Sequence, residues 1–484
     1  MKKPNKITFI ILFGFLFINA TYAEVTLPKI VSSNMVLQRN TTVTIWGWAA
    51  AHEDITISAS WLNSPLSIQA DKEGHWQIDI KTTNSKASQT IKIKSIASNI
   101  LLENIVFGEV WLCSGQSNMY QPLNGYTGQP TLGGNRAISQ ANNPNLRLFS
   151  VDKKGSKAPL KNVIGYTPWQ QATPESVASF SAVAYFFGQQ LQETLNIPVG
   201  LIHTSYGGSK IEAWMSKDVL SHYQDVSIHN ADLSRWARRT STSLFNAMIH
   251  PLTRYKIKGV LWYQGESNRD APEAYKQLFP AMVKDWRTRW NIGDFPFYYV
   301  QIAPFMYTGN DTFQTAYNTA FIREAQLMCL DLIPNSGIAI TMDIGHPEFI
   351  HPPKKKEVAD RLLRNALNKT YGYKNVEFAT PIFDSQELKD NGLLLKFKHA
   401  ENGLYTHQGL TDFEIAGSDK VFYPADAKIT NKKYVFVKSK NVKNPVAARY
   451  AWRNFINSTL FSNNLLPVSS FRTDTWETAT RAEQ

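Results

Sequence analysis

The sequence predicts a central α/β domain with a β-rich module on each side. In residues 24–105 and again in residues 371–484, apolar and polar residues alternate in short runs separated by turn residues. In residues 106–370, short apolar runs alternate with stretches whose apolar residues recur every three to four positions. Period-two alternation is typical of strands with one buried face, and strands that alternate with helices are typical of a parallel sheet. We therefore expect a β-sandwich-like module, a parallel sheet covered by helices on both faces, and a second β-rich module.

The length and composition fit this three-part organisation. The chain has 484 residues, which is two to three times the usual size of one domain. Hydrophobic residues make up 43% and charged residues 19%, a balance that excludes a disordered or collagen-like chain. Aromatic residues make up 12%, and exposed aromatic rings can stack on the faces of sugars.

Residues 1–23 are predicted to be a secretory signal peptide. Three lysines precede an apolar run at residues 7–18, and a small-x-small cleavage site follows at residues 21–23. No later segment reaches the roughly 18 consecutive apolar residues of a membrane-spanning helix. We expect an exported protein, periplasmic or secreted, that starts at Glu24 and has no membrane span.

The charge and cysteine content say little about partners. The formal net charge is +12, but the basic residues are scattered except for the run at residues 354–356, which we expect to be a solvated helix start. Nucleic acid is therefore not an expected partner. The two cysteines, Cys113 and Cys329, fall on an apolar strand and an apolar helix, so we expect two buried thiols and no disulfide.

The strands and helices follow from these patterns. In the N-terminal module we expect strands at residues 43–46, 55–58, 76–80 and 91–94. In the α/β domain we expect strands at residues 106–113, 199–203, 257–263, 297–302 and 337–342, and helices at residues 179–195 and 354–367. In the C-terminal module we expect strands at residues 393–398, 413–415 and 433–437. Because ligands bind at the carboxyl ends of parallel strands, the segments that follow the central strands are the candidate site.

Ser117 follows the first of these strands. A serine hydroxyl is a weak nucleophile that needs a base within hydrogen-bond reach and donors for the oxyanion it generates. Gly115 permits a tight turn before it. The alternative is that Ser117 only caps the helix that follows.

Two more segments follow strands and carry polar groups. The pair Gly207 and Gly208 follows the second strand, where a glycine lets a backbone N–H approach a ligand closely, although an ordinary turn would look the same. Gln264 and Glu266 follow the third strand, and a carboxylate at the sheet edge is costly unless it is used or paired.

A fourth segment, residues 343–352, supplies a candidate base. His351 precedes a helix, and Glu348 is three residues before it, so one loop turn could set its carboxylate against the imidazole, as a general base requires. His351 could instead be an ordinary loop residue. Metal ligation by Asp343, His346 and His351 is a further alternative, but no other histidine or cysteine cluster supplies the remaining ligands.

Together the four segments resemble a known family. The motif around Ser117 (residues 115–119), residues 207–214, residues 262–268 and residues 350–352 are similar in sequence, order and spacing to the blocks of sialate O-acetylesterases in the SGNH-hydrolase superfamily. Residues 322–326 and 471–474 also look familial.

This resemblance implies a three-layer α/β/α esterase domain with no metal and no organic cofactor. It implies Ser117 as the nucleophile of an acetyl-enzyme mechanism and His351 as its base. The implied oxyanion donors are the N–H of Ser117, an N–H of Gly207 or Gly208, and the side-chain amide of Gln264, with Asn268 as a less expected donor.

The acid that orients His351 is left open by the resemblance. Glu348 occupies the place of the superfamily's usual aspartate, and Glu266 and then Asp343 are the alternatives. Where relatives carry an acid directly before the isoleucine–histidine pair, this chain has Phe349.

The implied substrate is an O-acetylated sugar or glycan, with O-acetylated sialic acid as the first candidate. The alternatives are an acetyl esterase of plant polysaccharides such as xylan or xyloglucan, and a carbohydrate-binding protein without catalysis. The last is less favoured because both Ser117 and His351 are present.

Overall fold

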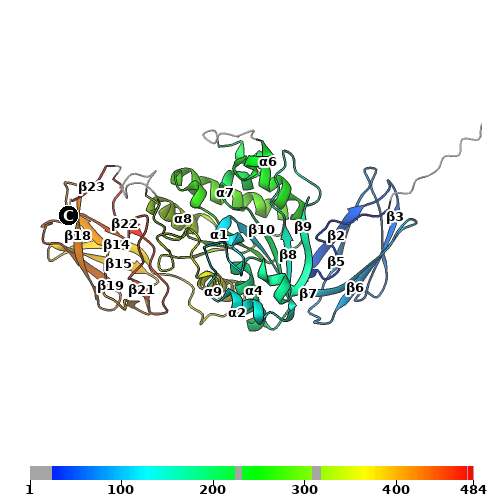
Figure 1. The fold of residues 1–484 in the computed structure, drawn as a ribbon, viewed down its shortest axis with the longest axis horizontal. Coiled ribbons are helices and arrows are strands. Elements are labelled where there is room, and N and C mark those ends of the chain that lie inside the picture. The colour runs from blue at the N-terminus through cyan, green and yellow to red at the C-terminus, as the bar shows by residue number, and fades with distance from the viewer. Residues whose placement is uncertain (1–23, 224–231, 308–317, 477, 483–484) are drawn as a thin grey trace, which may run out of the picture.

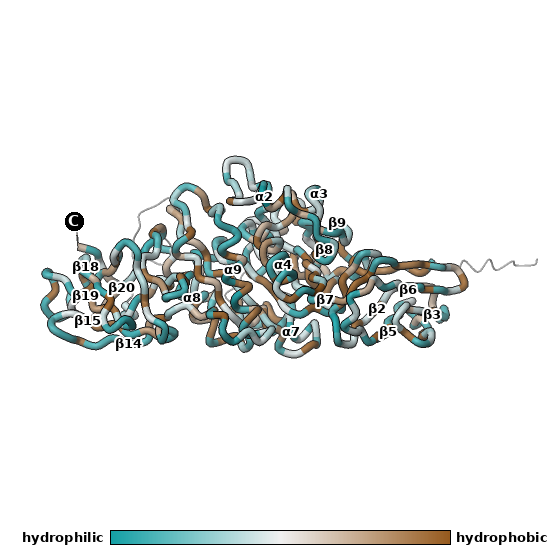
Figure 2. The backbone as a smooth tube through the Cα atoms, turned by 90° about the horizontal axis from the view of Figure 1, so that it is seen from below, coloured by the Kyte–Doolittle hydropathy of each residue, from teal (hydrophilic) through white to brown (hydrophobic). Residues whose placement is uncertain are grey.

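The computed structural model describes residues 24–223, 232–307, 318–476 and 478–482, so the predicted signal peptide lies outside the described residues. Figure 1 shows an elongated molecule in which an α/β part lies between two β-rich parts. In the perpendicular view of Figure 2 the three parts again follow one another in a row, and hydrophobic chain is prominent along β7 (Asn99–Gly115). The described residues contain no helix that is long and apolar enough to cross a membrane.

The N-terminal part consists of short, mostly antiparallel strands. One pair is formed by β2 and β5, and β3 lies between β4 and β6. Burial alternates along β3, as the period-two pattern predicted. The strands are β1 (Val36–Gln38), β2 (Thr42–Trp48), β3 (Asp54–Ala59), β4 (Leu66–Gln69), β5 (His75–Lys81) and β6 (Gln89–Lys94).

The long strand β7 belongs to two parts of the molecule at once. Its first half pairs antiparallel with β6, and its second half pairs parallel with β10 (Val199–Ser205) and β11 (Gly259–Tyr263). The strand crosses the expected module boundary between residues 105 and 106 without a break. The N-terminal part is therefore joined to the central sheet by continuous hydrogen-bonded chain.

The central sheet is parallel, as predicted, except at one edge. Its strand order is β13-β12-β11-β7-β10-β8-β9, and only the edge strand β9 runs antiparallel to its neighbour. This order places β11, β7 and β10 side by side, so the segments that leave them emerge together. The remaining strands are β8 (Asn143–Val151), β9 (Tyr166–Ala172), β12 (Phe297–Val300) and β13 (Ser336–Ala339).

Helices cover both faces of this sheet (Figure 1). Along β11, Val260 and Trp262 are buried in one hydrophobic cluster with residues of α7, whereas Leu261 and Tyr263 are buried in another with residues of α4 and α9. Successive side chains of a strand point to opposite faces, so both faces are covered. The helices are α4 (Ala182–Leu195), α7 (Pro272–Trp290), α8 (Ala320–Leu332) and α9 (Lys355–Asn365).

The C-terminal part is the predicted second β-rich region, with strands in the order β14-β15-β19-β18-β17-β20-β22. Its tail contacts the α/β part through Arg472, which pairs with Glu324 of α8 at 2.9 Å. On the same helix, Gln326 donates to the carbonyl oxygen of Gln264 at 3.0 Å. Helix α8 therefore links this part to the segment that follows β11. The strands are β14 (Ile382–Lys389), β15 (Gly392–Lys398), β16 (Leu404–Tyr405), β17 (Phe413–Ala416), β18 (Val421–Thr430), β19 (Tyr434–Lys438), β20 (Ala447–Tyr450), β21 (Phe461–Ser462), β22 (Phe471–Arg472) and β23 (Thr480–Arg481).

Both cysteines are free and buried, which confirms the expectation of two thiols. Burial raises the pKa of both, that of Cys329 to about 12, so neither is a reactive thiolate at neutral pH.

Candidate active site

Ser117 is presented by a turn that only glycine permits. At the end of β7, Gly115 has a φ of +139°, and a Cβ added there would lie 2.1 Å from the carbonyl oxygen of Tyr263 on the neighbouring strand. The chain then enters the short helix α1 (Ser117–Tyr120), whose N-cap residue is Gln116. Ser117 is half-buried, and its hydroxyl makes no hydrogen bond to any described residue. The alternative that Ser117 serves as the helix cap does not apply here.

The turn after β10 lies against Ser117. Ser205 and Tyr263 pair with Gly115 in the sheet, so the segments after β10 and β11 emerge on either side of the nucleophile candidate. A Cβ added to Gly207 would lie 3.4 Å from the Cβ of Ser117, at the short end of contact distance. The turn after β10 is therefore in van der Waals reach of the serine.

Unpaired backbone donors surround Ser117. Within the described part of the chain, the N–H groups of Ser117, Gly207 and Gly208 make no hydrogen bond. Gly208 has a φ of +72°, and a Cβ placed there would be 3.3 Å from the Nε of Arg238. The turn therefore offers free N–H groups beside the serine and carries a guanidinium on its outer side.

Gln264 does not offer a free amide. Its Nε2 donates to the carbonyl oxygen of Ser209 at 3.0 Å and to Oδ1 of Asn268 at 2.8 Å, so both of its hydrogens are engaged. Asn268 also accepts from the N–H of Ile211 at 3.0 Å, and its Nδ2 donates to Glu212 at 3.0 Å. One hydrogen of the Asn268 amide is left, which reverses the expected preference for Gln264 over Asn268 as a donor.

His351 is oriented by a glutamine rather than by an acid. Its Nδ1 lies 2.8 Å from Oε1 of Gln129, and because an amide oxygen can only accept, Nδ1 carries the proton and Nε2 is the free base. The edge of the ring contacts Tyr126 at 5.0 Å between centroids. Burial, with a smaller contribution from the charge of Lys355, lowers the pKa of His351 to about 4.

Two contacts hold the serine and histidine segments together. The hydroxyl of Tyr126 donates to the carbonyl oxygen of Ser117 at 3.0 Å, and Nδ2 of Asn118 donates to the carbonyl oxygen of Ile350 at 3.1 Å. The imidazole and the Ser117 hydroxyl do not hydrogen-bond each other directly in the described structure. Catalytic hydrogen bonds of unliganded enzymes are often long and tighten when substrate binds.

The expectation that Glu348 orients His351 is not met. The Nδ1 of His346 accepts the backbone N–H groups of Glu348 and Phe349 at 3.1 and 3.2 Å, and this tight turn leaves the Glu348 side chain exposed. Asp343 is not free for the role either, because Arg361 donates a hydrogen bond to each of its two carboxylate oxygens, at 2.7 and 2.6 Å.

Glu266 lies in a buried polar network beneath the site. Its Oε1 accepts from Nδ2 of Asn118 at 2.6 Å, and Nζ of Lys355 donates to Oδ1 of the same asparagine at 2.5 Å. Burial raises the pKa of Glu266 and lowers that of Lys355 to about 7, while the opposite charge of each partner works against these shifts. Glu266 is thus attached to the residue after Ser117, not to His351.

The possible metal ligands are not gathered. Among the described residues, Asp343 is engaged by Arg361, His346 caps backbone N–H groups, and His351 faces Gln129. The described side chains that could share an ion are instead Asp71, Glu73 and His75, in a turn of the N-terminal part.

Sequence reasoning missed Gln129 and Lys355. Gln129 is a neutral side chain between Gly128 and Pro130, a setting that signals only a loop. Lys355 sits in the run of three lysines expected to be solvated, yet its side chain is completely buried. The pattern of α9 contains the missing signal, because Lys355 lies three residues before Val358, on the buried face of the helix.

Comparisons with known proteins show which family the chain resembles. A family model described as "Carbohydrate esterase, sialic acid-specific acetylesterase" matches residues 107–366. The chain is 30% identical over 398 residues to the sialate O-acetylesterase of Homo sapiens, covering 74% of this chain and 73% of the human protein. It is 28% identical over 466 residues to that of Pongo abelii, covering 87% of this chain and 86% of that protein.

A solved structure extends the likeness to the fold. The structure of XAC1771, described as a novel carbohydrate acetylesterase from Xanthomonas citri, matches with a TM-score of 0.85 at 33% identity and covers 93% of this chain and 100% of its own. These findings confirm the resemblance inferred from the four motifs. The chain belongs to the family of sialic acid-specific acetylesterases and is a carbohydrate esterase.

Proposed function

We propose that this protein is a serine esterase that removes O-acetyl groups from a carbohydrate through an acetyl-enzyme, with O-acetylated sialic acid as its substrate. The observation that carries the proposal is the unengaged hydroxyl of Ser117, which lies against Gly207 among unpaired backbone N–H groups. A nucleophile and N–H donors without partners in one place are what the attack on an acyl carbon and the stabilisation of its oxyanion require.

In this mechanism the Nε2 of His351 takes the proton of Ser117 as Oγ attacks the acetyl carbonyl carbon. The tetrahedral intermediate then collapses, the bond to the sugar oxygen breaks, and His351 returns the proton to that oxygen. Water, deprotonated by His351, then attacks the acetyl carbon, the bond from that carbon to Oγ of Ser117 breaks, and His351 returns the proton to Oγ as acetate leaves. Gln129 holds the Nδ1 proton and so keeps Nε2 directed at the reaction.

The oxyanion would be stabilised by the N–H groups of Ser117 and of the Gly207–Gly208 turn and by the free hydrogen of Asn268. Each donor of this kind is worth about 3–4 kcal/mol of transition-state stabilisation. The α/β part would then be the three-layer esterase domain of the SGNH superfamily, with neither metal nor organic cofactor.

Two cations near the site favour an anionic sugar. Arg238 lies on the outer side of the Gly208 turn, and Nζ of Lys153 lies 3.9 Å from the ring centre of Tyr120. Neither has a carboxylate partner among the described residues. Sialic acid carries a carboxylate that such groups would bind, whereas acetylated xylan and xyloglucan backbones are neutral.

The test is acetate release from O-acetylated sialic acid and from acetylated xylo-oligosaccharides. We expect wild type to act on the sialic acid, and Ser117→Ala and His351→Ala each to lose at least about a thousandfold in kcat. The matched control is Ser139→Ala, because this exposed hydroxyl bonds only to its own helix. Activity on the xylo-oligosaccharides alone would support the esterase mechanism and contradict sialic acid as the substrate, in favour of a plant polysaccharide. No release from either would favour the carbohydrate-binding alternative.

We also propose that the protein is exported to the periplasm or secreted after removal of residues 1–23. The support is the sequence of the leader: a basic start, an apolar run and a small-residue cleavage site. Amino-terminal sequencing of the mature protein should begin at Glu24, and an intact leader would contradict this proposal.

A further inference from the structure

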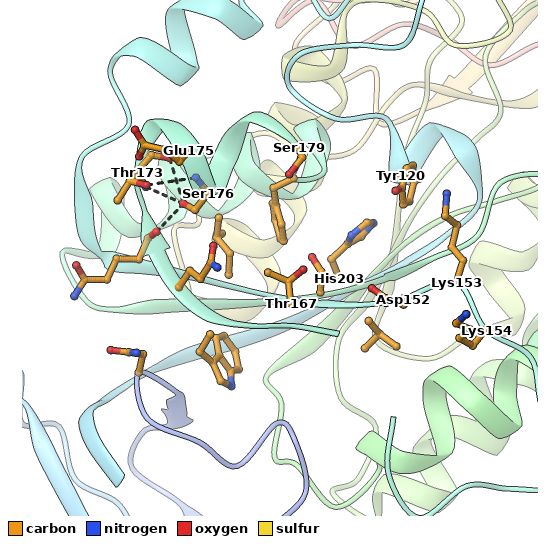
Figure 3. Close-up of a pocket in the computed structure, with 18 residues that line it drawn as sticks. Tyr120, Asp152, Lys153, Lys154, Thr167, Thr173, Glu175, Ser176, Ser179 and His203 are labelled. Atoms are coloured by element: carbon orange, nitrogen blue, oxygen red, sulfur yellow. Dashed lines mark hydrogen bonds between the residues drawn. The ribbon is translucent and has the colours of Figure 1, made fainter. Parts of the chain in front are cut away.

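A long groove runs along the β8 and β9 side of the sheet, next to the catalytic residues. Figure 3 shows Tyr120 and Lys153 toward one end of this groove and Thr173 and Glu175 toward the other. Its volume is about 1020 Å³. Sites for a single small ligand occupy roughly 300–1,000 Å³, so the groove has room for several sugar units.

Two aromatic rings lie between the groove and the candidate catalytic residues. Tyr120 ends the short helix that Ser117 begins. The ring of Tyr120 lies parallel to that of Tyr126, with 6.4 Å between centroids and 7° between planes. Tyr126 in turn contacts the ring of His351 and the carbonyl oxygen of Ser117. A glycan whose acetyl group lies at Ser117 could therefore extend past these rings into the groove.

The walls of the groove suit sugar hydroxyls. The amide side chains of Gln170 and Gln171 and the hydroxyls of Thr167 and Ser179 make no hydrogen bond in the described structure, so they are free to bind a ligand. His203, which also lines the groove, is buried and neutral, because burial and the charge of Lys153 lower its pKa to about 3. The lining thus offers uncharged donors and acceptors beside an aromatic ring, which is what sugar recognition needs.

The charge of the groove is concentrated at the end near the catalytic residues. Lys153 and Lys154 both line it there, and neither forms an ion pair with a described residue. Asp152 lines the same end, and its Oδ2 lies 2.3 Å from where a Cβ added to Gly165 would stand, so this end holds two lysines and one acid. Glu175 lies at the far end (Figure 3). An anionic sugar would bind with its carboxylate at the lysines, close to Tyr120.

We propose that this groove binds the sugar units next to the acetylated one, and that Lys153 binds the carboxylate of an acidic sugar in that chain. The substrate is then an acidic oligosaccharide rather than a free monosaccharide. This inference rests on the proposed function, and it adds the size and charge of the substrate.

The test is binding without turnover, so that it stands apart from the esterase assay. Calorimetry on the full chain would compare non-acetylated sialyllactose with free sialic acid and with lactose. We expect sialyllactose to bind at least about tenfold more tightly than either, because free sialic acid reaches Lys153 without filling the groove, and lactose fills the groove without a carboxylate for Lys153. A charge-assisted hydrogen bond of this kind corresponds to about a tenfold change in Kd. Lys153→Met should therefore raise the Kd for sialyllactose about tenfold, and Lys153→Arg should restore most of the affinity.

The matched control is Lys157→Met, an exposed lysine of the same loop that does not line the groove. Equal affinities for sialyllactose and free sialic acid would overturn the proposal, and so would a Lys153→Met effect no larger than that of Lys157→Met. A xylo-oligosaccharide bearing glucuronic acid would be the other acidic probe. Binding of that probe with the same Lys153 dependence would support the groove and identify a uronic acid as the source of the carboxylate. Tight binding of neutral xylotetraose, independent of Lys153, would overturn the role of the carboxylate.

Discussion

Two groups of residues around the candidate active site, which we call its floor and its mouth, are held together by different interactions. The floor contains buried charged groups, and the mouth contains neutral groups joined by hydrogen bonds. The floor consists of Glu266, Asn118 and Lys355, a buried carboxylate and a buried ammonium joined by one amide. The mouth consists of Tyr126, Gln129 and His351, which are half-buried and neutral near pH 7. Charges that are buried must be paired, and the floor pairs them through Asn118, although Oε2 of Glu266 has no hydrogen-bond partner among the described residues. The mouth contains no charged group that needs a partner, and its hydrogen bond to Nδ1 determines which nitrogen of His351 carries the proton.

The floor and the mouth have different roles: the floor positions two chain segments, and the mouth determines the tautomer of His351. Asn118 follows Ser117 and also binds the carbonyl oxygen of Ile350, the residue before His351, so the floor fixes where the Ser117 and His351 segments lie. Gln129 contacts the imidazole itself and fixes its tautomer. Damage to the floor should therefore appear first in stability, and damage to the mouth first in pH dependence.

The largest expected effect comes from removing one charge of the floor. Glu266→Gln or Lys355→Met leaves the other charge buried without its counterpart, which costs about 3–5 kcal/mol of unfolding free energy. The double variant should recover a large part of this loss, because no unpaired charge remains. Urea denaturation of the four proteins measures the coupling between the two residues.

Lys356→Met is the matched control for Lys355→Met. Lys356 is the next residue of the same helix, but its side chain is exposed. Its Nζ lies 3.4 Å from Oδ2 of Asp360, and a surface ion pair of this kind contributes at most about 1 kcal/mol to stability. If the two lysine variants lose equal stability, or if the double variant loses the sum of both singles, the floor is not a coupled pair.

The same contrast explains what the sequence could predict. Ser117, Gly207 and His351 lie directly after predicted strands or before a predicted helix, and parallel strands bring such segments to one edge, so these residues could be found from pattern alone. Gln129 reaches His351 across 222 residues of chain from a surface loop, and no local pattern encodes that contact. Likewise, the free hydrogens of Gln264 could not be counted before its contacts with Ser209 and Asn268 were known.

The next largest effect concerns Gln129. The proposed base, His351, could accept a proton only when neutral, and because its pKa is lowered to about 4, activity should hold down to that pH and be lost as the pH falls through it. Gln129→Ala removes the acceptor of the Nδ1 proton and should lower kcat about tenfold. Gln129→Glu places a carboxylate beside the imidazolium, which raises the pKa of His351 by at least about one unit. The pH dependence of kcat/KM on a chromogenic acetyl ester measures both.

If kcat/KM of wild type instead falls on the acid side with a midpoint near pH 6.5, and Gln129→Glu has the same midpoint, Gln129 does not face the base during catalysis. Asn124→Asp is the control, because it adds an acid at an exposed position of the same loop.

A smaller effect is expected at Arg238, on the outer side of the Gly208 turn. If this guanidinium, instead of Lys153, binds the carboxylate of the sialic acid, Arg238→Met should raise KM for O-acetylated sialic acid about fivefold to tenfold and leave the neutral chromogenic ester nearly unaffected. Arg235→Met, at an exposed position of the preceding short helix, is the control. An equal loss of kcat on both substrates would assign Arg238 to the oxyanion instead of the sugar carboxylate.

The smallest effect is expected at Glu348, the residue that the sequence favoured as the orienting acid. Its side chain is exposed and makes no contact with His351, so Glu348→Gln should change kcat/KM by less than about twofold and leave the acid limb in place. The comparison with Gln129→Ala on the same ester decides between the two residues, because both variants remove one candidate partner of the same imidazole. A large loss in Glu348→Gln together with a silent Gln129→Ala would mean that the turn at His346 opens and brings the carboxylate to Nδ1 when substrate binds. The reverse result would establish that a neutral amide oxygen is sufficient to orient the base of this esterase.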